Sequence, residues 1–179
     1  MTLSEAKELL IKNDITFEVL EFENEAEYWL HAMSFPYTKN AKYCKVIAII
    51  IKSKNEKKNI ELQFNNVDGV YCFEELCFGD YCFEMFDYNE EMLADELINN
   101  ILKIMQGHLR IINLTDLIKK RWLADACFDL NDDDDVFGEV GFQKAMKRIE
   151  KPKNFLSKLK RSKKQYEIYD WNTYQCIIK

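Results

Sequence analysis

Three pairs of strand-like segments, each joined by a short polar turn, place the strongest constraint on the fold of this chain. The segments are rich in branched and aromatic residues, and their connections are too short for a parallel crossover, so each pair is predicted to run antiparallel. The pairs are Tyr43–Ser53 with Asn59–Phe64, Leu109–Ile118 with Trp122–Leu130, and Tyr166–Tyr169 with Tyr174–Ile178.

Two further segments are predicted to be strands. Ile15–Phe22 alternates with branched and aromatic residues, and Tyr81–Tyr88 follows the turn dipeptide Gly79-Asp80. Asn59–Phe64 has the clearest alternation, because its apolar residues share one face and its polar residues the other. The apolar set is Ile60, Leu62 and Phe64, and the polar set is Glu61 and Gln63.

Helices are predicted between these strands. A capping box at Thr2 and Glu5 begins the first, and Gly107 provides a left-handed cap for the most regular one. The first predicted helix runs from Thr2 to about Asn13. Four more are predicted at Asn24–Ser34, Glu90–Gln106, Val140–Ile149 and Pro152–Lys160. The fold class is therefore predicted to be α+β: one domain over residues 1–179, with a mainly antiparallel sheet built from hairpins and helices packed on one face.

Composition favours a cytoplasmic protein. No run of eighteen apolar residues exists, so no membrane span is predicted, and the first residues lack the pattern of a signal peptide. The six cysteines are expected to be reduced thiols that act as small buried hydrophobes, and the spacing of Cys72, Cys77 and Cys82 fits no zinc or thioredoxin motif. Lys outnumbers Arg by 21 to 4, which hints at an AT-rich bacterial genome.

The segment Asp68–Glu96 has ten acidic residues, no Lys or Arg, and seven interleaved aromatic residues. A segment this aromatic is expected to fold, so part of its charge lies on an ordered surface that attracts cations. Tyr-Cys-Phe-Glu occurs twice, at Tyr71–Glu74 and Tyr81–Glu84, which indicates two neighbouring elements with similar amphipathic demands. The predicted binding surface consists of Glu74, Glu75, Asp80, Tyr81, Glu84 and Asp87.

Known catalytic and metal-binding motifs are missing from the sequence. It contains no nucleophile elbow, no phosphate-binding glycine loop and no HExxH pattern. The acidic run Asp132–Asp135 lacks the glycine and glutamate positions of an EF-hand, so a solvated loop is favoured over a calcium site. We therefore expect no catalytic residue, no cofactor and no metal site.

A basic segment, Lys147–Lys164, has nine basic residues against Glu150 alone, a net charge of +8. Since the whole chain carries −6, the remainder carries −14. Docking of this segment against the chain's own acidic surface is favoured over contact with nucleic acid, because the surrounding field is acidic. The predicted basic patch comprises Lys147, Arg148, Lys158, Lys160, Arg161, Lys163 and Lys164.

These features favour a non-catalytic binding protein with a cationic protein partner, such as an inhibitor or immunity-type protein that neutralises a basic toxin nuclease. The alternative is a hydrolase with a carboxylate-based, metal-assisted site drawn from Glu74, Glu84, Asp129 and His108. Nucleic acid and membrane are not expected as partners. Pairing of two copies through exposed edge strands is left open.

Overall fold

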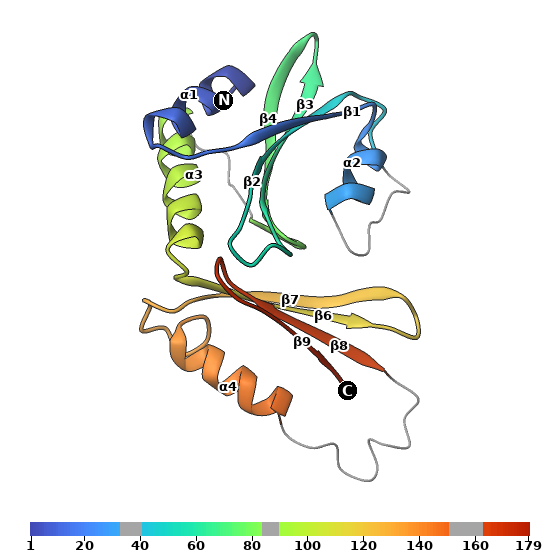
Figure 1. Cartoon of the computed structure of the whole chain (residues 1–179), viewed down its shortest axis with the longest axis vertical. Helices are drawn as coiled ribbons and strands as arrows, with labels where there is room; N and C mark the ends of the chain where they lie inside the picture. The colour runs from blue at the N-terminus through green and yellow to red at the C-terminus, as the bar shows by residue number, and fades with distance from the viewer. Residues whose placement is uncertain (33–40, 84–89, 151–162) are drawn as a thin grey trace. The chain divides into compact units, whose positions relative to one another are not determined.

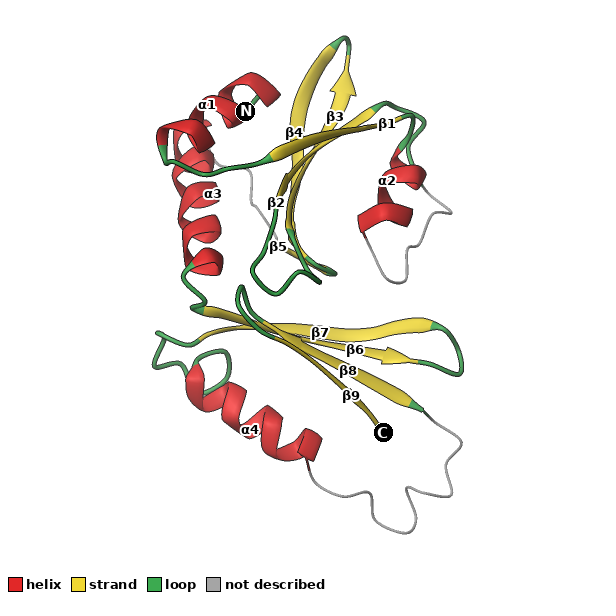
Figure 2. Ribbon diagram, in the orientation of Figure 1, coloured by secondary structure: helices red, strands yellow, loops and turns green. Residues whose placement is uncertain are grey.

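The computed structural model describes residues 1–32, 41–83, 90–150 and 163–179. They belong to two compact units, Met1–Leu102 and Lys103–Lys179. The predicted α+β class and antiparallel pairing are confirmed, although the strands form two sheets rather than one (Figures 1 and 2). The single domain over 1–179 stays a prediction. Among the described residues, no helix is long and apolar enough to span a membrane.

The first unit has a five-stranded antiparallel sheet whose strands follow one another in chain order. They are β1 (Glu18–Phe22), β2 (Val46–Ile51), β3 (Ile60–Val67), β4 (Val70–Phe78) and β5 (Tyr81–Phe83). β4 has no counterpart among the strands predicted from the sequence. Asp68 and Gly69 both adopt positive φ angles, 51° and 88°, which is the backbone of the tight hairpin turn that Asp-Gly favours, and this turn joins β3 to β4.

Three helices accompany this sheet: α1 (Leu3–Lys12), α2 (Glu25–Ala32) and α3 (Glu90–Met105). The capping box at the start of α1 is confirmed, and Gly107, at φ 75°, ends α3 as predicted. Tyr28 of α2 packs on alternate residues of β2, and Figure 1 shows α1 and α3 along the other face of the sheet. Helices therefore cover both faces, which explains why every residue of β2 is buried.

The second unit has a four-stranded antiparallel sheet in the order β7-β6-β8-β9. Its strands are β6 (Leu109–Asp116), β7 (Arg121–Asp129), β8 (Lys164–Tyr169) and β9 (Tyr174–Ile178). Helix α4 (Glu139–Glu150) packs its apolar stripe on one face, where Phe142 and Ile149 meet Ile112, Phe128 and Ile168. Both hairpins predicted for this part of the chain are confirmed. The helix predicted at Pro152–Lys160 lies outside the described residues.

Candidate functional site

A layer of buried polar side chains lies on the face of the first sheet that α2 covers. Glu61, Gln63 and Asn65 of β3 point to this face, and they are only 6%, 1% and 2% exposed. Their cross-strand neighbours on β2 are Ile50, Ala48 and Val46, which pack against Tyr28. The alternation predicted for β3 is confirmed, and the polar face is buried as well as the apolar one.

Helix α2 contributes the buried carboxylate of Glu25 to this layer. One oxygen of Glu25 accepts the backbone N–H of Lys42 at 2.6 Å, and the other accepts the side-chain amide of Gln63 at 3.3 Å. The Gln63 amide also donates to Asn65 Oδ1 at 2.9 Å. These hydrogen bonds connect three segments: helix α2, strand β3 and the residue Lys42, which precedes β2.

Several polar atoms of this layer have no hydrogen-bond partner among the described residues. They are Trp29 Nε1, Gln63 Oε1 and Asn65 Nδ2, whereas the Tyr28 hydroxyl and the Glu61 carboxylate lie close enough to shift each other's pKa. An unpaired buried polar group costs about 1–3 kcal/mol, so three on one face make this a costly polar cluster. Such clusters are typical of ligand sites, where strain in the free protein is relieved by a bound group.

A pocket of about 310 Å³ opens beside these atoms. It is lined by Glu25, Trp29, Lys42, Gln63, Glu74 and Glu75. Lys42 Nζ pairs with Glu74 Oε1 at 2.5 Å at the rim, where both side chains are about half exposed. Three carboxylates against one ammonium give the lining a net charge of −2 when all four groups are ionised.

Burial and mutual repulsion perturb the carboxylates of this face. Desolvation raises the pKa of Glu75, and the charges of Glu74 and Glu25 raise it further, while Lys42 opposes them. Desolvation also raises the pKa of Glu61 to about 7. The hydrogen bond from Lys42 to Glu74 raises the pKa of Lys42. A cation entering the pocket would favour the ionised carboxylates and so lower these pKa values.

The predicted acidic binding surface is divided by the structure. Glu74 and Glu75 line the pocket, whereas Asp80 forms an ion pair with Lys58 at 2.6 Å, in which the two side chains are only 8% and 10% exposed. Tyr81 stacks edge-on against Phe83, with ring centroids 5.0 Å apart. Glu84 and Asp87 lie outside the described residues. The role of these residues in binding stays a prediction.

The hydrolase candidates have other partners in the structure. The Asp129 carboxylate accepts a hydrogen bond from Lys103 Nζ at 2.8 Å, and His108 donates its backbone N–H to the Lys103 carbonyl as α3 ends. Glu74 is held by Lys42, and Glu84 is outside the described residues. Among the described candidates, His108 is close enough to Asp129 for its charge to help lower the pKa of that carboxyl, while Glu74 belongs to the other unit.

The acidic loop uses its side chains to organise its own backbone. Asp134 Oδ1 accepts the backbone N–H groups of Val136 and Phe137 at 2.7 and 2.6 Å, and these bonds lower its pKa. Asp132 accepts the N–H of Asp134 at 2.9 Å. The loop is thus a series of turns that leads into α4.

Part of the basic patch is described. Lys147 and Arg148 are exposed in the last turn of α4, Lys163 is exposed, and Lys164 begins β8 opposite Asp116. Lys158, Lys160 and Arg161 lie outside the described residues. Contact of this patch with nucleic acid, or with the chain's own acidic surface, stays a prediction.

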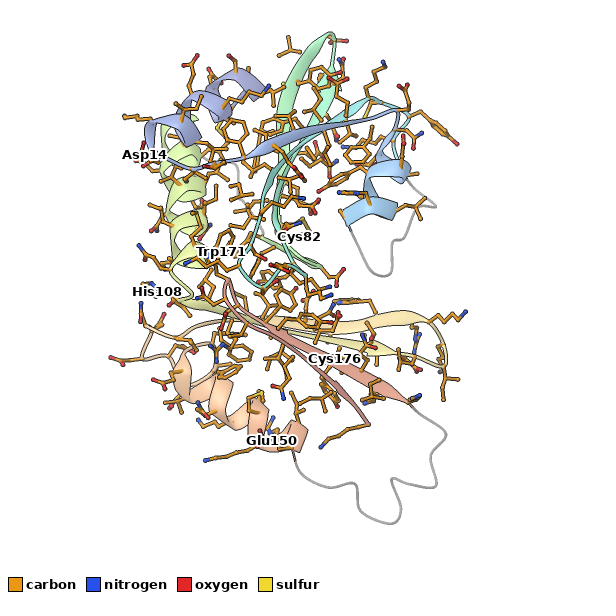
Figure 3. The ribbon with its side chains drawn as sticks, in the orientation of Figure 1. Asp14, Cys82, His108, Glu150, Trp171 and Cys176 are labelled. Carbon is orange, nitrogen blue, oxygen red and sulfur yellow. A yellow bond between two sulfur atoms is a disulfide. The ribbon has the colours of Figure 1, made fainter. Side chains whose placement is uncertain are left out.

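The expectation that all cysteines are reduced is wrong for two of them. Cys77 and Cys82 form a disulfide across the β4–β5 hairpin, and Cys82 is labelled in Figure 3. The predicted Gly79-Asp80 turn explains this pairing. In a hairpin with a two-residue turn, residues five apart such as Cys77 and Cys82 lie directly opposite each other. Within the described residues, Glu75, Cys77 and Cys82 are also the group whose side chains could hold a metal ion.

Sequence reasoning missed Glu25, Trp29, Lys42 and Gln63 as pocket residues. Glu25 and Trp29 occupy an ordinary helix and Lys42 precedes a strand, so none has a local motif. One pattern did point to a buried polar layer. The uninterrupted apolar run of β2 indicates a strand covered on both faces, and polar residues on its neighbour β3 are then buried too.

Comparisons of the chain with protein-family models, with curated proteins and with solved structures found no match.

Proposed function

We propose that this chain is a non-catalytic binding protein whose acidic pocket beside α2 receives a cationic side chain of a basic partner protein. The observation that carries this proposal is the pocket of about 310 Å³ in which Glu25, Glu74 and Glu75 converge beside unpaired buried polar atoms. Neutralisation of a basic toxin, such as a nuclease, is the specific form of this function that we favour.

The chemistry of the lining favours a guanidinium or ammonium group over other ligands. Such a group brings several N–H donors, and the acceptors that face it are carboxylates and the unpaired Gln63 Oε1. The Trp29 side chain in the same lining adds an aromatic surface on which a cation is stabilised. An anion would instead meet the net negative charge and is disfavoured.

Lys42 already provides one internal cation at the rim, and its displacement is inexpensive. Its ion pair with Glu74 is 56% and 41% exposed on the two sides, and an exposed pair of this kind contributes about 0–1 kcal/mol. A partner arginine that bridges two carboxylates forms charge-assisted bonds about twice as strong as neutral ones. Exchange of Lys42 for the partner's group is therefore favourable.

The test compares two variants of equal net charge. In Glu74→Gln/Glu75→Gln the pocket loses two carboxylates, whereas Glu8→Gln/Asp133→Asn removes two exposed carboxylates elsewhere. Calorimetric titration with a synthetic arginine-rich peptide is expected to give an affinity at least tenfold weaker for the pocket variant, and unchanged for the control. An acidic peptide of the same length should not bind.

Equal losses in the two variants would show that the peptide responds only to net charge, and absence of binding to the wild type would end the proposal. The same three proteins then serve as baits in lysate of the source cell. A basic protein retained by the wild type and the control but lost from the pocket variant is the result we expect. Retention by all three baits would place the interface elsewhere.

A further inference from the structure

We propose that Cys77, Cys82 and Glu75 form a binding site for a thiophilic divalent cation, with zinc as the natural choice, when the two cysteines are reduced. The site lies on the β4–β5 hairpin. Its ligand differs from that of the function proposed above, and the two sites share Glu75.

The hairpin brings the three side chains to one face of the sheet. Cys77 and Cys82 are directly opposite each other in the β4–β5 register, with Cα atoms 4.1 Å apart. Glu75 precedes Cys77 by two residues on the same strand, and side chains two apart point to the same face. The two sulfur atoms and a Glu75 carboxylate oxygen all lie within 4.8 Å of one another.

This spacing is close to what zinc requires. With Zn–S bonds of about 2.3 Å and Zn–O bonds of about 2.0–2.2 Å, ligand atoms in a tetrahedral site stand roughly 3.3–3.8 Å apart. Small side-chain rotations reach these separations once the sulfur atoms are no longer bonded. Two thiolates and a carboxylate make three ligands, and a water molecule completes the tetrahedron.

The surroundings also favour a cation at this corner. Glu61 is the cross-strand neighbour of Cys77 on β3, so its side chain is on the same face, and the residue is only 6% exposed. A divalent ion beside this carboxylate reduces the electrostatic cost of burying it.

Reduction must come before metal binding, because the structure has the disulfide. A dithiol reductant transfers two electrons and two protons, so that its own thiols become a disulfide and the Cys77–Cys82 bond becomes two thiols. Metal binding then releases both thiol protons to solvent, since the thiolate is the ligand. The disulfide and the metal complex therefore exclude each other, and the redox state decides whether the cation binds.

The experiment titrates the whole chain with Cd²⁺, a zinc substitute whose thiolate complexes absorb in the ultraviolet. We expect the reduced protein to bind one equivalent and to show the sulfur-to-metal absorption, which Zn²⁺ then displaces. The oxidised protein should show no such band. Cys44→Ser/Cys72→Ser is the control, because these cysteines are outside the cluster but in the same unit.

Two variants test the assigned ligands. Cys77→Ser/Cys82→Ser should lose the band. Glu75→Gln should keep it with an affinity weakened at least roughly tenfold, because loss of a ligand should cost no less than loss of a residue that only hydrogen-bonds to a ligand. The Glu75 variant retains both cysteines and its disulfide, so it reports on folded protein even if the serine variant fails to fold. The proposal is overturned if the reduced wild type shows no band, if the control variant abolishes it, or if Glu75→Gln binds as tightly as the wild type. The serine variant leaves the pocket carboxylates intact, so failure here is distinguishable from failure of the proposed binding function.

Discussion

Lys58→Met is the substitution that most directly tests our account of the charges in the first unit. Lys58 Nζ and Asp80 Oδ2 are 2.6 Å apart, and their side chains are 10% and 8% exposed. Methionine retains most of the apolar stem and removes the ammonium group, so Asp80 keeps its buried charge without this partner. Breaking a buried pair in this way costs about 3–5 kcal/mol, a large share of a typical folding free energy of 5–15 kcal/mol.

The ion pair between Lys42 and Glu74 provides a matched comparison. Its atoms are 2.5 Å apart, nearly the same distance, but its side chains are 56% and 41% exposed. Solvent screens such a pair, so Lys42→Met is expected to cost at most about 1 kcal/mol. The difference between the two variants therefore measures the effect of burial rather than of distance.

The assay is urea unfolding at pH 7 of the oxidised protein, followed by far-ultraviolet circular dichroism. The double variant Lys58→Met/Asp80→Asn should regain most of the lost stability, because neither charge remains buried. Our reasoning is refuted if Lys58→Met costs less than Lys42→Met, or if the double variant is as unstable as the sum of its single substitutions. Strong destabilisation would also show why Asp80 cannot be assigned to a binding surface from charge alone.

Three further outcomes are expected. Glu61→Gln should become more stable relative to the wild type as pH rises from 4.5 through about 7. Because the folded-state pKa of Glu61 is raised to about 7, its contribution to wild-type stability is present below the unfolded-state pKa and is lost as pH rises through the folded-state pKa. This shift corresponds to about 3 kcal/mol, and urea unfolding curves that give the same stability difference at every pH would contradict it. Lys42→Met should bind an arginine-rich peptide more tightly than Lys54→Met, a control of equal net charge, because only the former frees the pocket of its internal cation, and equal calorimetric affinities would count against this. Gly141→Ala should lower the free energy of unfolding by about 1–3 kcal/mol, because its Cβ would lie 1.9 Å from the Val136 carbonyl oxygen. An unchanged melting temperature would show that the backbone at Val136 shifts without cost and would contradict this prediction.

Much of the secondary structure follows from local rules. The Thr2–Glu5 capping box, the Gly107 cap and the apolar stripe of α4 act within a few residues, so the helix ends that they predict are confirmed. The hairpins at β2–β3, β6–β7 and β8–β9 depend on short turns and were also found. The missed strand, β4, has the same kind of local cue in its Asp-Gly turn.

The candidate site could be predicted only in part. Glu74 and Glu75 were selected for their charge, and they do line the pocket, but Asp80 was selected on the same ground and is buried against Lys58. Charge along a sequence does not distinguish these cases, because the difference lies in what the neighbouring strands and helices bring to each carboxylate.

The sequence by itself determined the α+β class, the antiparallel hairpins and most of the helix ends, since each depends on side-chain period, turn residues or caps that act over short distances. Only the tertiary structure decided that the strands divide between two sheets and that α2 buries the polar face of β3. It also decided that Glu25, Lys42 and Glu75 surround one pocket. These residues belong to α2, to the segment that precedes β2 and to β4, which are separated in sequence and meet only where the sheet is formed. Pairing between strands is a long-range interaction, and no local pattern of residues specifies which distant side chains it brings together.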